Sequence, residues 1–316
     1  MMDWTDRHCR YLHRALSRRT LLYTEMVTAP ALVRGGARHL LRFDPAEHPV
    51  ALQLGGSDPR ELAAAAAMGA DEGYDEINLN VGCPSDRVQS GTFGAVLMKT
   101  PEVVAECVTA MQAATTVPVT VKCRIGVDDQ TPGEMLPDFL SKMQAAGVRH
   151  VAIHARKAWL KGLSPKENRD IPPLDYDLVY RLKSERPDLE IILNGGLSSL
   201  AESVDCKGNL DGVMVGRAAY HTPWILADVD RLLFGAENPV ATPFEAVSAY
   251  RPYIDDQLSQ GAKLHAITRH MLGLFSGRPG ARKWRQILSS EANKPGAGWS
   301  VVEQALDAVR CGSEAA

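Results

Sequence analysis

The chain has 316 residues and a formal net charge of −3. That length accommodates one α/β barrel of about 250 residues with a small additional domain, or two ordinary domains. The charge excludes a protein that coats nucleic acid indiscriminately, so any contact with RNA must be local. No stretch approaches the roughly 20 apolar residues of a membrane span, and no secretion signal is recognisable. We therefore expect a soluble, cytoplasmic protein, and we expect a monomer.

Six cysteines are scattered along the chain, with no C-x-x-C pair and no Cys/His cluster at zinc spacing. We expect neither a disulfide framework nor a metal site. The cysteines are Cys9, Cys83, Cys107, Cys123, Cys206 and Cys311.

Seven short apolar runs recur at regular intervals and predict strands at 21–27, 50–54, 76–81, 117–124, 150–155, 190–194 and 212–215. Between these runs, apolar residues recur at helical spacing and predict helices at 59–73, 101–114, 135–146 and 176–186. This alternation predicts βα units around a parallel sheet. The strands should be buried on both faces, because they are almost continuously apolar.

A closed barrel requires eight strands, and the sequence offers seven. The predicted fold is a TIM (β/α)8 barrel whose first strand is truncated, because residues 1–6 are typical of the loop that follows a strand. We expect the missing strand upstream of Met1. The alternative is an open sheet or an incomplete barrel.

The character of the sequence changes after Gly235, where a Pro-containing linker is followed by helical patterns alone. Apolar residues fall on one stripe at Ala246, Val247, Tyr250, Tyr253, Ile254 and Leu258, and on another at Val301, Val302, Ala305 and Val309. We predict a catalytic barrel domain at 1–235 and a helical domain at 242–316.

Polar residues close most of the predicted strands. In an α/β barrel the chemistry lies at the carboxyl ends of the strands, so these positions predict a functional site. They are Gln53, Asn80, Cys83, Lys122, Arg124, His154, Asn194 and Arg217.

The last two strands are followed by glycines, at Asn194-Gly195-Gly196 and at Gly216-Arg217. Loops at this place in a barrel often bind phosphate through backbone N–H groups, and glycine lets the backbone approach closely. Their joint placement favours a phosphate site over two ordinary glycine turns. Arg217 would add a positive charge to that site.

Lys122 lies in an otherwise apolar strand, where an anionic cofactor would supply the partner that a buried lysine needs. If the phosphate belongs to FMN, Lys122 could stabilise negative charge on the reduced ring, with His154 and Gln53 bonding its polar edges. The alternative for Lys122 is a side chain that extends past the barrel rim, and the alternative for His154 is an ordinary histidine of the core.

Cys83 lies in a Gly-Cys-Pro-Ser loop just beyond a strand. A free cysteine is mostly protonated near neutral pH and can act as a general acid. We assign it that role, whereas the alternative is an inert buried thiol.

These residues lie within longer stretches that together resemble the dihydrouridine synthase family, in particular the bacterial branch that modifies positions 20 and 20a of the tRNA D-loop. The most specific stretches are YDEINLNVGCPSDRVQSGTFGAVLM, VPVTVKCRIG, HARKAWLKGLSPKENRDIPPLDY and DGVMVGRAAYHTPWIL. The resemblance implies FMN bound in the barrel, NADPH as reductant, a helical domain that holds tRNA, and Cys83 as proton donor to the reduced uridine.

The resemblance also implies two sets of contact residues. Those for FMN are Met1, Gln53, Lys122, His154, Asn194, Gly195, Gly196, Gly216 and Arg217, and those for tRNA are Asn80, Lys166, Arg169, Arg282 and Arg285. Two features depart from the family pattern: only Met1 remains of an Ala-Pro-Met triplet, and Cys123 stands where His or Thr is more usual.

The segment 263–294 carries seven basic residues and one acidic residue, a local balance of +6. We interpret it as a clamp for tRNA phosphates centred on Arg282 and Arg285, whereas the alternative is a solvated helix face. Two other functions compete with RNA modification. They are a barrel flavoenzyme acting on a free small molecule, and an RNA-binding protein that has lost catalysis.

Overall fold

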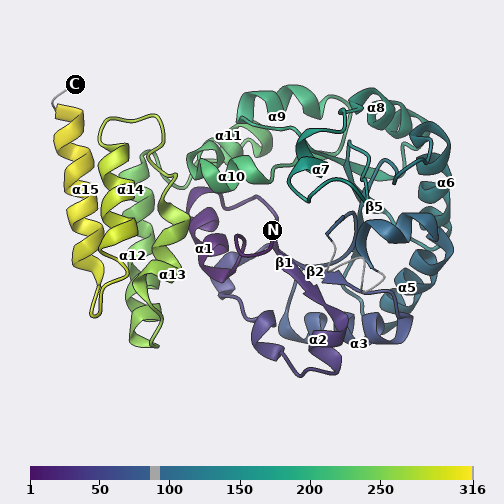
Figure 1. Cartoon of the computed structure of the whole chain (residues 1–316), viewed down its shortest axis with the longest axis horizontal. Coiled ribbons are helices and arrows are strands. Elements are labelled where there is room, and N and C mark those ends of the chain that lie inside the picture. Colours follow the sequence, from purple (N-terminus) through teal and green to yellow (C-terminus); the bar gives the residue numbers. More distant parts are fainter. Residues whose placement is uncertain (86–92, 315–316) are drawn as a thin grey trace. The chain divides into compact units, whose positions relative to one another are not determined.

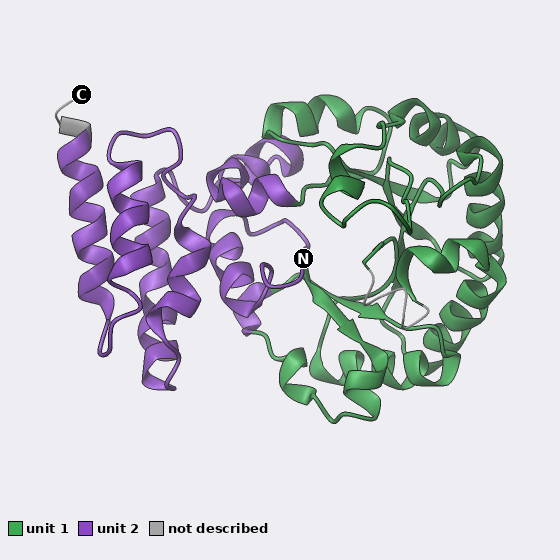
Figure 2. Cartoon of the chain, viewed as in Figure 1, with its two compact units in different colours: residues 1, 23–43, 48–216 green, residues 2–22, 44–47, 217–316 purple. Residues whose placement is uncertain are grey.

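The computed structural model describes residues 1–85 and 93–314, so the part of the predicted motif from Asp86 to Thr92 lies outside it. The contacts divide the chain into two compact units (Figure 2). Unit 1 comprises Met1 and residues 23–43 and 48–216, and unit 2 comprises residues 2–22, 44–47 and 217–316. The functional domains placed at 1–235 and 242–316 stay a prediction.

Unit 1 is built on a curved sheet whose strand order follows the chain order (Figure 1). Its strands are β1 (Leu22–Thr28), β2 (Val50–Gly55), β3 (Glu76–Val81), β4 (Val119–Arg124), β5 (His150–His154), β6 (Glu190–Asn194) and β7 (Gly212–Met214). Every pair from β2 to β7 is parallel. Sequential order without a reversal is that of an α/β barrel and not of a doubly wound sheet. The seven predicted strands and the TIM-like fold are confirmed among the described residues.

Helices follow the strands, and the longer ones lie on the outer side of the sheet (Figure 1). The α-helices of unit 1 are α2 (Ala29–Val33), α3 (Pro59–Glu72), α5 (Pro101–Ala114), α6 (Pro132–Ala145), α7 (Glu167–Asp170), α8 (Tyr176–Glu185) and α9 (Leu200–Lys207), and its 3-10 turns are η1 (Arg38–Leu41) and η3 (Gly94–Lys99). Capping residues mark the ends of these helices, as α3 illustrates. Asp58 accepts hydrogen bonds from the N–H groups of Arg60 and Glu61 at the start of α3, and Gly73 ends that helix at φ +100°.

The central strands are fully enclosed, since every residue of β2 and β3 is buried. Leu52, Leu54, Ile77, Leu79 and Val121 have no exposed surface. A sheet covered on both faces holds its strands rigidly, and it therefore fixes the positions of the polar side chains at the strand ends.

Unit 2 is helical. Its elements are α1 (Arg7–Leu16), η2 (Pro45–Glu47), α10 (Arg217–His221), η4 (Pro223–Leu226), α11 (Val229–Phe234), α12 (Pro243–Ser259), α13 (Leu264–Thr268), η5 (Arg269–Met271), α14 (Ala281–Ser290) and α15 (Trp299–Glu314). The predicted apolar stripes are buried except at Leu258 and Val301, which are half-buried. No helix in the described part of the chain is long and apolar enough to cross a membrane.

Helix α1 packs against α12 through aromatic and polar contacts. The rings of Tyr11 and Tyr253 are stacked with centroids 4.0 Å apart, and the Tyr250 hydroxyl donates to the His8 carbonyl over 2.7 Å. The buried Arg10 guanidinium of α1 lies 2.5 Å from Glu47. These contacts make the residues before the first strand part of the helical unit.

Candidate functional site

The strand register brings the predicted polar residues together at one edge of the unit 1 sheet. Asn80 on β3 is the partner of Lys122 on β4, and Arg124 on β4 is the partner of His154 on β5. His154 is in turn the partner of Asn194 on β6. Because the carboxyl ends of parallel strands meet at the same edge, these side chains form one site.

The amide of Gln53 is held on both sides by asparagines of β3. Its Nε2 donates to Asn78 Oδ1 over 2.9 Å, and its Oε1 accepts from Asn80 Nδ2 over 2.8 Å. These two bonds fix which end of the Gln53 amide carries the N–H groups. One N–H of Gln53 is left for a bound group.

The hydrogen bonds continue below Gln53 through buried polar residues. Asn78 Nδ2 donates to Thr120 Oγ1 over 2.8 Å, and that hydroxyl donates to Glu76 Oε1 over 2.7 Å. The Tyr23 hydroxyl donates to the same carboxylate oxygen over 2.5 Å. Burial and the neighbouring Glu76 raise the pKa of Tyr23 well above its ordinary value, so the hydroxyl keeps its proton.

Tyr23, Glu76, Asn78 and Thr120 were not among the residues predicted for the site. A signal was present, because Glu76, Asn78 and Asn80 alternate with Ile77 and Leu79 and therefore point to one face of the strand. A row of polar residues on the inner face of a buried strand indicates a hydrogen-bonded network, since each member needs a partner.

Asn80 also shapes the loop that carries Cys83. Its Oδ1 accepts hydrogen bonds from the N–H groups of Gly82 and Cys83, each over 3.0 Å. The Ala95 N–H donates to the Cys83 carbonyl over 2.9 Å. The half-buried thiol lies 3.6 Å from the Ser85 hydroxyl, to which it donates. The backbone at Cys83 is thus fixed on both sides, while the thiol remains accessible.

Two cations and a histidine lie beside this loop. Burial, followed by the neighbouring Arg124, lowers the pKa of Lys122 to about 8. Among the described residues, none accepts a hydrogen bond from the Lys122 ammonium. The Arg124 guanidinium is held in place, because it donates to the carbonyls of Gly82 over 3.1 Å and Asn168 over 2.9 Å. The sheet edge therefore offers positive charge to an anion.

His154 is neutral at physiological pH. Burial is the main cause that lowers its pKa well below the ordinary value, and Arg124 and Lys122 add to the effect because they disfavour a third positive charge. A neutral imidazole has one donor and one acceptor nitrogen. His154 can thus hydrogen-bond a polar ring without adding charge.

The backbone after β6 forms a cradle against His154. Gly195 and Gly196 have φ of +107° and +78°, a region that side chains rarely tolerate. A Cβ on Gly195 would lie 2.3 Å from His154 Cδ2, and one on Gly196 would lie 2.6 Å from Leu174 Cδ1. The Tyr176 hydroxyl donates to the Gly195 carbonyl. Glycine is thus required at both positions by conformation and by space.

The remaining predicted residues lie on several elements. A Cβ on Gly216, just after β7, would lie 3.7 Å from Met1 Sδ, so Met1 lies at the same strand end. Arg217 opens α10, and Lys166 is exposed at the start of α7, one turn from Arg169. Arg282 and Arg285 are exposed on α14 of unit 2. Arg217, Arg282 and Arg285 belong to unit 2, whereas the sheet edge belongs to unit 1.

Polar side chains at the carboxyl edge of a parallel sheet whose strands follow the chain order are typical of enzymes of the α/β-barrel class. The model of the dihydrouridine synthase family matches residues 1–310. The chain belongs to that family and is therefore an oxidoreductase.

Curated relatives cover almost the whole chain. A tRNA-dihydrouridine(20/20a) synthase of Salmonella typhi is 58% identical over 97% of this chain and 92% of its own length. Proteins of the same name from Vibrio cholerae serotype O1 and Xanthomonas axonopodis pv. citri are 57% and 56% identical, again over 97% of this chain and over 94% and 91% of their own lengths. The resemblance inferred from the sequence is thereby confirmed.

Proposed function

We propose that this protein is a cytoplasmic tRNA-dihydrouridine synthase that uses FMN and NADPH to reduce the C5=C6 bond of uridine at positions 20 and 20a. The proposal rests mainly on one arrangement. Lys122, Arg124 and a neutral His154 lie at the strand ends beside a glycine cradle, with the Cys83 thiol on the adjoining loop.

The residues at the sheet edge fit FMN. Gly195 and Gly196 carry no Cβ and have positive φ, which lets the backbone approach a phosphate closely, and we assign Asn194, Gly216 and Arg217 to the same phosphate. Lys122 would face the flavin ring, and His154 and Gln53 would bond its polar edges. Met1, at the same strand end, would contact the ring.

When bound, reduced FMN supplies the hydride that adds to C6 of the uracil. The C5=C6 bond is conjugated to the C4 carbonyl, so negative charge develops on that oxygen and on C5. Cys83 holds the proton that C5 takes up, and the Asn80 hydrogen bonds fix the backbone that carries the thiol. Lys122 would stabilise the negative charge of the reduced flavin ring.

The target uridine must leave the tRNA stack to reach this edge. We assign contact with the tRNA to Asn80, Lys166 and Arg169 in unit 1 and to Arg282 and Arg285 in unit 2. The four cations would bind phosphates and orient the tRNA without reading its sequence. Asn80 has one N–H left after its bond to Gln53, and that donor would meet the inserted base.

The cradle makes a direct prediction. Gly195→Ala should lower the free energy of unfolding by about 1–3 kcal/mol because of the backbone strain, and should weaken FMN binding at least about tenfold. Flavin titration followed by fluorescence measures the second effect. Gly73→Ala is the matched control. Gly73 has a similar positive φ of +100°, but a Cβ added there would have no atom within 4 Å. It should lose stability and keep FMN affinity, and equal FMN affinity for the two variants would contradict the assignment.

The absorption spectrum of the purified protein, together with tRNA binding, tests the function itself. We expect flavin bands from non-covalent FMN and measurable affinity for tRNA. Protein that stays colourless after reconstitution with FMN would support an RNA-binding protein without catalysis. Flavin without tRNA binding would support a flavoenzyme for a free small molecule.

A further inference from the structure

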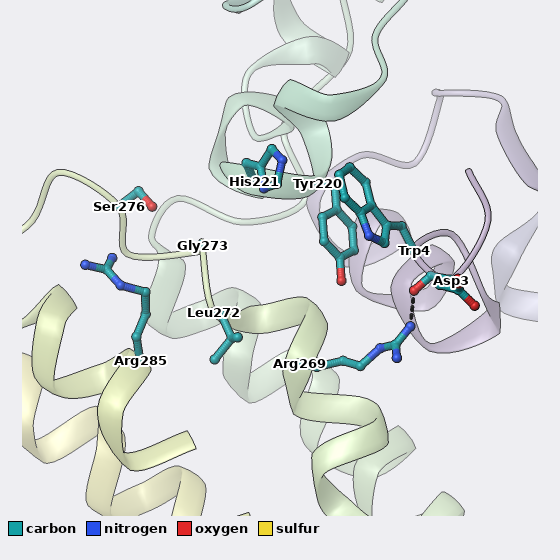
Figure 3. A pocket seen from close by; sticks show the side chains of 9 residues that line it. All are labelled: Asp3, Trp4, Tyr220, His221, Arg269, Leu272, Gly273, Ser276 and Arg285. Carbon is teal, nitrogen blue, oxygen red and sulfur yellow. Dashed lines mark hydrogen bonds between the residues drawn. The ribbon is translucent and has the colours of Figure 1, made fainter. Parts of the chain in front are cut away.

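Unit 2 contains a pocket of about 560 Å³ that the proposed chemistry does not use (Figure 3). Three segments of the chain line it: Asp3 and Trp4, then Tyr220 and His221, then the region from Arg269 to Arg285. The volume lies in the range of about 300–1,000 Å³ that is typical of sites for small organic groups. It is large enough for a single nucleotide.

One wall of the pocket is aromatic. The Trp4 and Tyr220 rings are stacked with centroids 4.6 Å apart and planes 10° from parallel. His221 meets Trp4 edge-on, with centroids 4.9 Å apart. Neither Trp4 nor Tyr220 is fully buried. Partly exposed aromatic rings of this kind are the platforms on which proteins stack the bases of single-stranded RNA.

The other walls carry positive charge. Arg269 is exposed and donates to the Asp3 carbonyl, as the dashed line in Figure 3 marks. Arg285 reaches the pocket from α14, and within the described ranges no acidic side chain pairs with it. Asp3 is the acidic residue among those that line the pocket. Arg269 also lies 4.0 Å from the Asp6 carboxylate, so Arg285 is the cation that favours an anionic ligand here.

The pocket is held by buried contacts and is therefore pre-formed. His270, with a fully buried side chain, lies 3.0 Å from the Asp6 carboxylate, which also caps α1. The Trp284 indole donates to the Met271 carbonyl over 3.0 Å. Gly273 packs so closely that a Cβ would lie 1.9 Å from the His221 carbonyl oxygen. Pre-formed walls lower the entropy lost when a ligand binds.

We propose that this pocket binds one unstacked nucleotide of the RNA substrate. Its base would lie against the wall of Trp4 and Tyr220, and its phosphate would meet Arg285 and Arg269. The inference rests on the proposed function and adds a nucleotide subsite to it. The pocket also distinguishes Arg285 from Arg282, which the sequence analysis assigned to the same role. Arg285 lines the pocket and Arg282 does not.

The test compares Arg285→Ala and Trp4→Ala in the full chain, with an unmodified tRNA transcript as the probe and fluorescence anisotropy as the readout. Each variant should bind tRNA about tenfold more weakly. Arg285→Ala should also reduce the slope of affinity against salt by about 0.7, the contribution of one phosphate on a single strand. Trp4→Ala should leave that slope unchanged, since stacking involves no ion release.

Three controls make the outcome decisive. Arg310→Ala removes one exposed arginine of unit 2 that pairs with Asp307 over 2.9 Å, and should bind tRNA as the wild type does. Trp4→Phe keeps a ring and should restore most of the affinity, which distinguishes a stacking role from a folding defect. AMP and NADPH are titrated separately, because a free nucleotide has the same chemistry.

Wild-type affinity and salt slope in both variants would overturn the proposal, as would AMP or NADPH binding that needs Arg285 while tRNA binding does not. The proposed function fails differently. In that case the wild-type protein itself forms no dihydrouridine in tRNA, whatever the variants bind.

Discussion

Cys83→Ala should reduce dihydrouridine formation by about 10²- to 10⁴-fold, the usual contribution of a positioned general acid. Flavin content and the rate of flavin reduction by NADPH should stay at the wild-type level, because the substitution removes the proton donor alone. The loop should keep its shape, since Asn80 holds it through backbone N–H groups and not through the thiol. Stopped-flow absorbance follows flavin reduction, and single-turnover reaction with tRNA follows product formation.

Cys123→Ala is the matched control. Cys123 follows Lys122 on β4 but is fully buried, and burial raises the pKa of its thiol to about 12. The variant should modify tRNA at nearly the wild-type rate. Wild-type product formation in Cys83→Ala, or an equal loss in Cys123→Ala, would remove Cys83 from the proposed reaction.

Lys122→Met should slow dihydrouridine formation by about 10²- to 10³-fold, as expected when one charge is removed from a developing anion. The pH dependence of FMN binding gives a second readout. Burial and Arg124 lower the pKa of Lys122 from 10.5 to about 8 in the cofactor-free protein. An anionic ligand requires the protonated lysine, so FMN affinity should fall as the pH rises above about 8, by up to about tenfold per pH unit.

The stability of the cofactor-free protein should change in the opposite direction. Between about pH 8 and 10.5 the unfolded lysine carries a proton that the folded lysine has lost, so Lys122 contributes stability that rises with pH across this window. Lys122→Met should abolish both dependences. Lys122→Arg stays charged and should bind FMN with an affinity that does not change above pH 8. An unchanged pH profile in Lys122→Met would show that Lys122 does not contact the anion.

The order of strands and helices was predictable because the apolar pattern is strong and local. Runs such as 117–124 and 190–194 are apolar enough to be strands buried on both faces, and glycine or proline ends most of the helices between them. The positions of Gln53, Lys122, His154 and Asn194 followed from the same pattern, since each closes a strand and parallel strands end at one edge.

Other features depend on partners that sequence spacing does not reveal. The network from Asn80 to Tyr23 joins four strands, and its register is set by tertiary packing. The nucleotide pocket unites residues 3–4, 220–221 and 269–285, which no local pattern connects. The helical spacing of Arg282 and Arg285 placed both on one side of α14, whereas only the geometry of the pocket distinguishes Arg285.

Mass spectrometry of nucleosides detects the proposed product itself. Unmodified tRNA is incubated with the FMN-loaded protein and NADPH, digested to nucleosides, and compared with a parallel reaction of Cys83→Ala. We predict a dihydrouridine signal that requires both NADPH and tRNA, maps to positions 20 and 20a, and is nearly lost in the variant. Absence of dihydrouridine from tRNA treated with flavin-loaded wild-type protein would rule out the proposed function.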